Sequence, residues 1–250
     1  MIDLEGIEER EKEVSVYLSD EQISEGESYI RQLCEEYGLD FSKDELENKN
    51  WNEVWEKSFQ PVWIGENVLI RAAFHQANHK AKYEIVIEPK MSFGTGHHPT
   101  TFQVMECMQL ISFENARVLD CGSGTGILAI LAELQGAEEV IALDNDIWSF
   151  MNVKENMALN ASEKIEPVMG ELSEMGDTGF DIILANIHRN YLLQHMSLLS
   201  EKMVKKGKIL MSGFYSGDAF VILEKALEHN LLANYYSVQH DWVCVVFEKH

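Results

Sequence analysis

At 250 residues, with 46% hydrophobic residues and only four prolines, the chain can hold one large domain or a standard α/β domain with a smaller attachment. Its net charge of −22 argues against direct binding of nucleic acid, since nonspecific affinity for a phosphate backbone comes from Lys and Arg. No apolar run reaches the roughly 18 residues of a membrane span, and residues 1–10 are too acidic for a signal peptide. We therefore expect a cytoplasmic protein that binds neither nucleic acid nor membrane.

The acidic excess is concentrated near the start of the chain. Residues 1–50 hold 16 Asp and Glu against 5 Lys and Arg, and 5 − 16 gives a net charge of −11, half of the total. Such a surface either keeps the chain in solution or attracts a basic protein partner. The four cysteines are widely spaced without a C-x-x-C pair, so neither a disulfide framework nor a metal site is predicted.

The first predicted elements form a small α+β unit. Residues 14–18 alternate as a short strand, and Ser19 with Gln22 has the spacing of a capping box for a helix that stops at Gly38. One strand and one helix bury each other poorly, so this unit is expected to be incomplete.

A helix and two strands are predicted next. Asn50 can cap a helix on which Trp51, Trp55 and Phe59 share one face, either as core or as a hinge between domains. Residues 67–74 and 82–88 read as strands with a polar connection between them.

Residues 89–101 are a loop by composition. Gly94 and Gly96 give backbone freedom, and Thr100 with Gln103 has capping-box spacing for the helix that follows. His97 and His98 either fill this loop or serve a site.

From residue 117 strands and helices alternate, which predicts an α/β fold with a doubly wound, mostly parallel seven-stranded sheet. The last two strands are close enough to form a hairpin, which makes the last strand antiparallel. The predicted strands are residues 117–121, 140–144, 165–169, 180–186, 208–212, 235–239 and 242–248, and the helices are 126–135, 147–160, 191–203 and 218–229.

The first of these strands leads into a glycine turn, Asp120-Cys121-Gly122-Ser123-Gly124-Thr125-Gly126. Such a turn lets bare backbone approach a ligand at a helix N-terminus. The dinucleotide fingerprint G-x-G-x-x-G needs a third glycine where Ile127 stands, so the spacing is D-x-G-x-G-x-G instead.

Two other strand ends carry candidate ligand contacts, because ligands of open parallel sheets bind beyond the carboxyl ends of the strands. Asp144 follows Gly122 by 144 − 122 = 22 residues, near the spacing at which an acid binds ribose hydroxyls. Its alternative role is a helix N-cap, for which Asp146 is better placed. Asn186 ends the next candidate strand, where an amide either contacts a ligand or only forms a turn.

At this point the sequence resembles the ribosomal protein L-eleven methyltransferase family, PrmA. The resemblance rests on the D-x-G-x-G-x-G turn and on shorter matches at 50–55, 144–146, 184–187 and 241–243, together with the run Phe93-Gly94-Thr95-Gly96-His97-His98-Pro99-Thr100-Thr101. It implies a Rossmann-like fold that uses S-adenosylmethionine to trimethylate amino groups of a basic ribosomal protein. It also implies a substrate-recognition region at 1–49, a linker helix and strands at 50–88, and a methyltransferase domain at 89–250.

The resemblance further implies which residues form the site. Thr101, Gly122, Gly124, Asp144 and Asn186 are the expected cofactor contacts, and Asn186 is also the candidate that orients the acceptor amine through its carbonyl oxygen. The segment after it, residues 187–191, is more polar than is common in the family, so acceptor contacts are expected to differ there.

Methyl transfer to an amine requires the neutral amine, and a lysine of pKa about 10.4 is only about 0.04% neutral at pH 7. Candidate bases by intrinsic pKa are His97, His98 and His188. Three other functions remain open: a nicotinamide-dependent dehydrogenase, a methyltransferase for another protein or a small molecule, and a non-catalytic scaffold that binds the cofactor.

Overall fold

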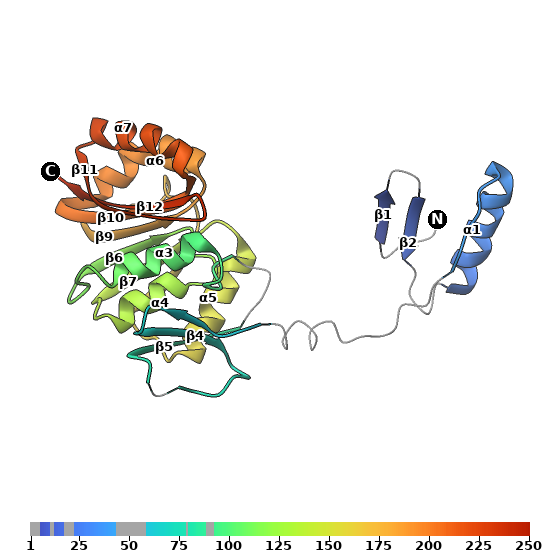
Figure 1. Ribbon diagram of the computed structural model, residues 1–250, viewed down its shortest axis with the longest axis horizontal. Helices are drawn as coiled ribbons and strands as arrows, with labels where there is room; N and C mark the ends of the chain where they lie inside the picture. Colours follow the sequence, from blue (N-terminus) through green and yellow to red (C-terminus); the bar gives the residue numbers. More distant parts are fainter. Residues whose placement is uncertain (1–5, 11–12, 18–22, 44–58, 79, 89–92) are drawn as a thin grey trace. The chain divides into compact units, whose positions relative to one another are not determined.

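The computed structural model describes residues 6–10, 13–17, 23–43, 59–78, 80–88 and 93–250. It divides into two compact units, residues 1–54 and 55–250 (Figure 1). No helix in the described ranges is long and apolar enough to cross a membrane.

The first unit contains a hairpin and a helix. Strands β1 (Gly6–Arg10) and β2 (Glu13–Tyr17) pair antiparallel, so the expectation of a single strand was wrong. Helix α1 (Ile23–Tyr37) ends at Gly38, as predicted, and Gly38 adopts a left-handed φ of 66°. The proposed capping box at Ser19 and Gln22 lies outside the described residues.

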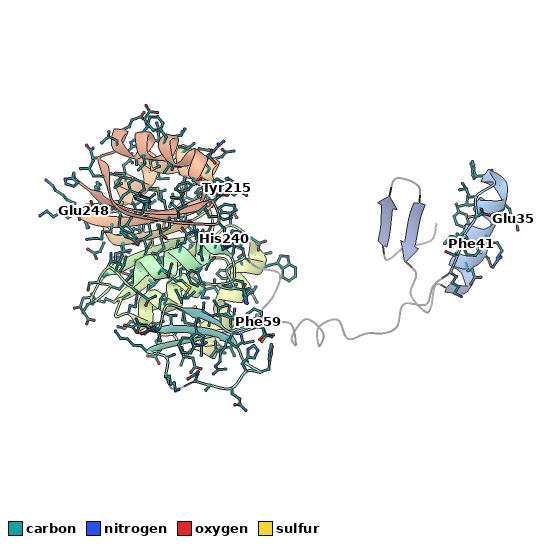
Figure 2. All side chains as sticks on the ribbon, viewed as in Figure 1. Glu35, Phe41, Phe59, Tyr215, His240 and Glu248 are labelled. Atoms are coloured by element: carbon teal, nitrogen blue, oxygen red, sulfur yellow. The ribbon has the colours of Figure 1, made fainter. Side chains whose placement is uncertain are left out.

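The second unit opens with a small three-stranded sheet. Its strands are β3 (Val62–Ile64), β4 (Val68–Ala72) and β5 (Tyr83–Ile87), of which β3 was not predicted. β3 and β4 pair antiparallel, whereas β4 and β5 are parallel. The predicted helix after Asn50 lies outside the described residues except for Phe59, which is labelled in Figure 2. Phe59 is buried and packs edge-on against His97 at 4.8 Å between ring centroids.

The main sheet has seven strands in the order β11-β12-β10-β9-β6-β7-β8. β12 pairs antiparallel with both of its neighbours, while the other pairings are parallel, which confirms the doubly wound sheet with an antiparallel last strand. The strands are β6 (Arg117–Cys121), β7 (Glu139–Asp144), β8 (Ile165–Met169), β9 (Phe180–Asn186), β10 (Met203–Tyr215), β11 (Leu231–Gln239) and β12 (Trp242–Lys249).

Helices cover both faces of this sheet (Figure 1). They are α3 (Pro99–Met108), α4 (Ile127–Leu134) and α5 (Ile147–Leu159) on one face, and α6 (Arg189–Lys202) and α7 (Ala219–Glu228), preceded by the short η1 (Ser216–Asp218), on the other. Alternate strand residues feed a core cluster on each face: Val118 and Leu184 belong to one, Leu119 and Ile183 to the other. Both faces are thus buried, as a parallel sheet requires.

The small sheet packs beneath α4 and α5 on the first of these faces (Figure 1). The side chain of Asn160 accepts a hydrogen bond from Val86 N at 2.8 Å and donates one to Val86 O at 2.6 Å. This amide therefore satisfies the backbone groups of Val86 that a neighbouring strand would otherwise pair with. These hydrogen bonds connect β5 to the C-terminal end of α5, which packs on the main sheet.

Candidate active site

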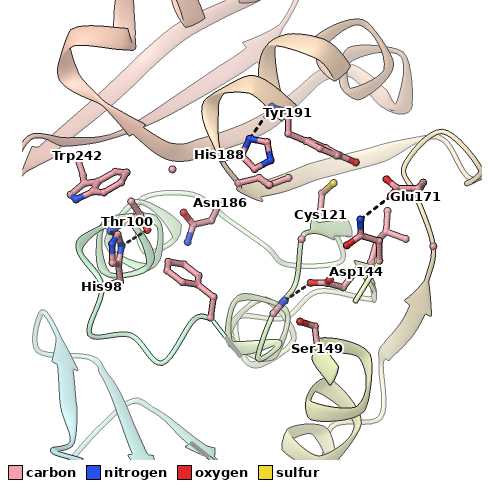
Figure 3. Close-up of a pocket in the computed structure, with 18 residues that line it drawn as sticks. His98, Thr100, Cys121, Asp144, Ser149, Glu171, Asn186, His188, Tyr191 and Trp242 are labelled. Atoms are coloured by element: carbon pink, nitrogen blue, oxygen red, sulfur yellow. Dashed lines mark hydrogen bonds between the residues drawn. The ribbon is translucent and has the colours of Figure 1, made fainter. Parts of the chain in front are cut away.

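A cavity of about 450 Å³ lies at the carboxyl ends of β6, β7, β8 and β9, where an open parallel sheet binds its ligands (Figure 3). Backbone from the glycine turn lies on one side of it, and aromatic and polar side chains lie on the other. The lining residues with polar or aromatic side chains are Phe93, His98, Thr100, Cys121, Asp144, Asn145, Ser149, Glu171, Asn186, His188, Tyr191 and Trp242.

The glycine turn meets the cavity with its backbone. Gly122 and Gly124 both line it, at φ values of 74° and 54° that disfavour any residue with a Cβ. A Cβ on Gly122 would also lie 3.2 Å from Ile187 Cγ1, a tight contact that the Ile187 side chain would have to relieve. Gly126 then serves as the N-cap position of α4.

Asp144 lines the cavity at the end of β7, and main-chain amides hold its carboxylate. Oδ2 accepts a hydrogen bond from Gly124 N at 2.9 Å, and Oδ1 accepts one from Asp146 N at 3.0 Å (Figure 3). The N-cap of α5 is Asp146, whose Oδ2 accepts from Ser149 N at 2.8 Å. Asp144 is thus not the cap, and each of its oxygens retains a lone pair for a ligand hydroxyl.

Asn186 lines the cavity at the end of β9, but Thr101 does not. Thr101 is buried behind Asn186, and its Oγ1 accepts a hydrogen bond from Asn186 Nδ2 at 3.2 Å. Asn186 Oδ1 is buried without a hydrogen-bond partner in the described part of the chain. Because buried polar groups are normally paired, this oxygen is an unsatisfied acceptor on a residue that lines the cavity.

His98 lines the cavity as the N-cap of α3. Its Nδ1 accepts from Thr100 N at 3.3 Å and lies 2.8 Å from Thr100 Oγ1. Burial lowers the pKa of His98, which favours the neutral ring with its proton on Nε2. His98 therefore carries an N–H donor on Nε2.

The predicted capping box at Thr100 and Gln103 was wrong. Pro99 occupies the first helical position, where its missing N–H costs nothing, so the cap falls on His98. Buried Gln103 instead donates through Nε2 to the carbonyls of Gln239 and Trp242, at 3.3 and 3.2 Å.

His188 repeats this arrangement at the N-terminus of α6, where Nδ1 accepts from Tyr191 N at 3.3 Å. His97, by contrast, is absent from the cavity lining. Its Nε2 lies 3.0 Å from Gln60 O and its Nδ1 3.2 Å from Thr95 Oγ1, so both ring nitrogens are engaged. None of the three candidate histidines offers a free lone pair to a substrate.

Trp242 completes the cavity on the side opposite Asp144 (Figure 3). Its indole meets the ring of Tyr215 at 4.0 Å on one side and that of His98, edge-on, at 5.0 Å on the other. The sequence contains a hint of this role in the match at residues 241–243, but no spacing rule links Trp242 to His98.

Two buried ionisable side chains near the glycine turn, Cys121 and Asp120, were not among the predicted site residues. Burial raises the pKa of the Cys121 thiol to about 12, which makes a thiolate nucleophile unavailable at neutral pH. Burial also raises the pKa of the Asp120 carboxyl to about 7. Asp120 Oδ2 accepts from Ala129 N at 3.1 Å, beneath the glycine turn rather than inside the cavity.

Within the described ranges, no group of three or more His, Cys, Asp or Glu side chains is arranged to hold a metal ion. The polar side chains of this site are instead a carboxylate, an amide and two imidazoles that cap helices, a set suited to hydroxyl and amino groups.

Comparison with known proteins gives a consistent result. The model of the family described as Ribosomal protein L11 methyltransferase (PrmA) matches residues 3–250. The Ribosomal protein L11 methyltransferase of Phocaeicola vulgatus is 41% identical over 211 residues, which cover 84% of this chain and 75% of that protein. The protein of that name from Porphyromonas gingivalis is 39% identical over 227 residues, covering 88% and 78% of the two chains.

Solved structures agree. The ribosomal protein L11 methylase of Lactobacillus delbrueckii subsp. bulgaricus aligns with a TM-score of 0.71 at 27% identity, over 77% of this chain and all of that one. A methyltransferase from Pyrococcus furiosus aligns with a TM-score of 0.52 at 17% identity, over 61% and 87% of the two chains, which shows a shared fold alone.

Proposed function

Since the chain belongs to the ribosomal protein L11 methyltransferase (PrmA) family, we propose that it transfers methyl groups from S-adenosylmethionine to amino groups of ribosomal protein L11. It is an S-adenosylmethionine-dependent methyltransferase by family. The acceptor atoms, lysine ε-amino or N-terminal α-amino nitrogens, are the part that the site chemistry must support.

The residues of the cavity fit this cofactor. Asp144 can accept hydrogen bonds from both ribose hydroxyls, because main-chain amides already fix its two oxygens and leave a lone pair on each. The main chain of Gly122 and Gly124 lines the cavity, where it can contact the methionine portion. S-adenosylmethionine bound there supplies a methyl group on a positively charged sulfur.

The unpartnered Oδ1 of Asn186 is the observation that carries the proposal. An amine or ammonium is a pure donor toward such an oxygen, whereas a carboxylate or phosphate would be repelled by it. Thr101 Oγ1 accepts from Nδ2, and this pairing leaves Oδ1 as the acceptor without a partner among the described residues. Asn186 therefore selects an N–H donor and directs the nitrogen lone pair away from itself, toward the methyl group.

The residues around the acceptor do not supply a strong base. His98 and His188 use Nδ1 to cap helices, so their exposed nitrogen carries a proton already. Deprotonation of a lysine at pH 7 costs about 4.6 kcal/mol. Trp242 and Phe93 line the cavity and would shield the amine from water, which lowers the pKa of the amine and so reduces this cost. The amine would then release its proton to water before it is aligned with the methyl group.

Charge supports a basic protein as the acceptor. A net charge of −22 attracts a basic ribosomal protein and repels nucleic acid. The proposed location is the cytoplasm, where ribosomal proteins are made, without direct contact to nucleic acid or membrane.

The test is incubation with labelled S-adenosylmethionine and ribosomal proteins from a strain that lacks the enzyme, followed by mass mapping of the labelled band. Label on lysine or N-terminal nitrogens of L11 is expected. Label on another protein would overturn the substrate, label on carboxylates would overturn the role of Asn186, and cofactor binding without any transfer would indicate a scaffold. Binding of NAD in place of S-adenosylmethionine would instead support a nicotinamide-dependent dehydrogenase.

A further inference from the structure

The loop from Phe93 to His98 lies directly on the glycine turn, and one buried residue of the turn makes the contact. We propose that Thr125 is a positioning residue that fixes this loop as a wall of the cavity and thereby sets how long the cofactor remains bound. The inference rests on the proposed function, because it takes the cavity to be the S-adenosylmethionine site.

Thr125 binds the loop twice. Its backbone N donates to Phe93 O at 3.0 Å, and its Oγ1 donates to Gly94 O at 2.6 Å. The side chain is fully buried, so water does not compete for the second bond. Two successive carbonyls of the loop are thus fixed by a single residue of the turn.

The two segments approach too closely for side chains. A Cβ on Gly124 would lie 2.4 Å from Phe93 O, and one on Gly94 would lie 3.0 Å from Thr125 Oγ1. Gly124 therefore has a second reason to be glycine besides the ligand: the loop carbonyl packs against its Cα.

Thr125 is itself held from the opposite side. Its carbonyl accepts from Asn156 Nδ2 on α5 at 2.8 Å, and Asn156 Oδ1 accepts from Glu88 N, at the end of β5, at 2.8 Å. The turn is therefore held in place by α5, and the loop is the segment that moves when the contacts with Thr125 open.

The loop forms part of the cavity lining. Phe93 and His98 both line it, with ring centroids 5.1 Å apart, and His97 anchors the loop to Gln60 O. If the Thr125 contacts open, Phe93 no longer covers the ligand on this side. Cofactor dissociation should therefore depend on the Thr125 hydroxyl, although Thr125 itself does not line the cavity.

The experiment compares Thr125→Val, which removes the hydroxyl at nearly constant shape, with Thr125→Ser, which keeps it. Ser200→Ala is the matched control, because Ser200 Oγ donates to His229 O at 2.9 Å in the same way but lies outside the cavity lining. Affinity and dissociation rate are measured for S-adenosylmethionine by calorimetry and stopped-flow tryptophan fluorescence. Hydrogen exchange of residues 93–98 is followed in the protein without cofactor.

We expect Thr125→Val to weaken affinity about three- to tenfold through faster dissociation, the effect of one lost hydrogen bond. Exchange in residues 93–98 should rise as well, while Thr125→Ser and Ser200→Ala remain within about twofold of the parent protein.

Unchanged affinity and exchange in Thr125→Val would overturn the inference. Equal losses in Ser200→Ala would also overturn it, since they would reflect general destabilisation. If the parent protein fails to bind S-adenosylmethionine at all, the proposed function falls too, a result distinct from a parent that binds and a variant that matches it.

Discussion

The two sides of the cavity are built in different ways. The proposed cofactor wall, formed by Gly122, Gly124 and Asp144, consists of main chain and of one carboxylate that main-chain amides hold. The proposed acceptor wall, formed by His98, Asn186 and Trp242, consists of side chains from three distant parts of the chain. Backbone geometry is fixed by the local order of residues, whereas the acceptor wall depends on long-range packing. Changes to the acceptor wall should therefore affect turnover, and changes to the cofactor wall should affect binding.

The largest effect is expected from Asn186→Ala, which removes the oxygen that we propose aligns the amine. Turnover should fall about 100- to 1000-fold, as when one aligned donor or acceptor is lost from an active site. Affinity for S-adenosylmethionine should change less than about threefold. Steady-state assays and calorimetry measure the two quantities. Asn234→Ala, an exposed amide on β11, is the control, and equal losses in turnover and affinity would contradict the division between the walls.

The second effect concerns Asp120, which supports the cofactor wall from beneath. Its pKa is raised by burial to about 7, from an ordinary value of 3.8. Its contribution to stability is therefore complete below pH 4 and is lost as pH rises through about 7. The difference is on the order of 4 kcal/mol. Relative to Asp120→Asn, which cannot ionise, the parent protein should become less stable between pH 4 and 8.

Thermal unfolding of both proteins across this pH range measures the difference. Parallel curves would show that Asp120 is ionised, or protonated, throughout. Activity is a poor readout here, because the neutral fraction of an acceptor lysine rises about tenfold with each pH unit over the same range.

Asp144→Ala should have a smaller effect, confined to binding. Loss of hydrogen bonds between a carboxylate and ribose hydroxyls should weaken cofactor affinity about 10- to 100-fold, with turnover at saturating cofactor largely retained. The matched control is Asp146→Ala, which removes the α5 cap but no group that lines the cavity. A control as weak in binding as Asp144→Ala would mean that the cap, and not the ribose contact, is responsible.

The smallest effect separates a cap from a base at His98. Asn also accepts hydrogen bonds well at an N-cap, so His98→Asn should retain most of the stability, whereas His98→Ala should lose about 1 kcal/mol. If His98 only caps α3 and donates a hydrogen bond, turnover should be largely retained in His98→Asn. In His98→Ala it should fall only as far as α3 is destabilised. Equal, large losses of turnover in both, with stability intact in His98→Asn, would restore His98 as a candidate base.

The same comparison explains what the sequence could predict. The glycine turn and Asp144 follow from spacing within one βαβ unit, because parallel strands bring their carboxyl ends together. Asn186 was predicted at a strand end, but its bond to Thr101, 85 residues away, could not be. Nor could the bonds of Gln103 to the β11–β12 turn, which cross 136 and 139 residues.

The errors in secondary structure have local causes. Residues 6–10 include one large apolar side chain and three charged ones, so their strand depends on pairing with β2 rather than on pattern. β10 runs from Met203 to Tyr215 instead of residues 208–212, because pairing with β9 and β12 extends it past Gly207. The α3 cap moved to His98 because the local pattern ignores the preference of Pro99 for the first helical position.

The position of β12 has a consequence for how the chain folds. It lies inside the sheet, between β10 and β11, although it follows both in sequence. Its alternate residues enter both core clusters, Cys244 and Val246 on one face and Val245 and Phe247 on the other. A nascent chain that has reached only residue 241 therefore lacks an interior strand, not an edge. Because non-local pairings form slowly, we expect β11 to join the other strands of this sheet only when β12 inserts between β10 and β11, in a late step that brings Trp242 to the candidate active site.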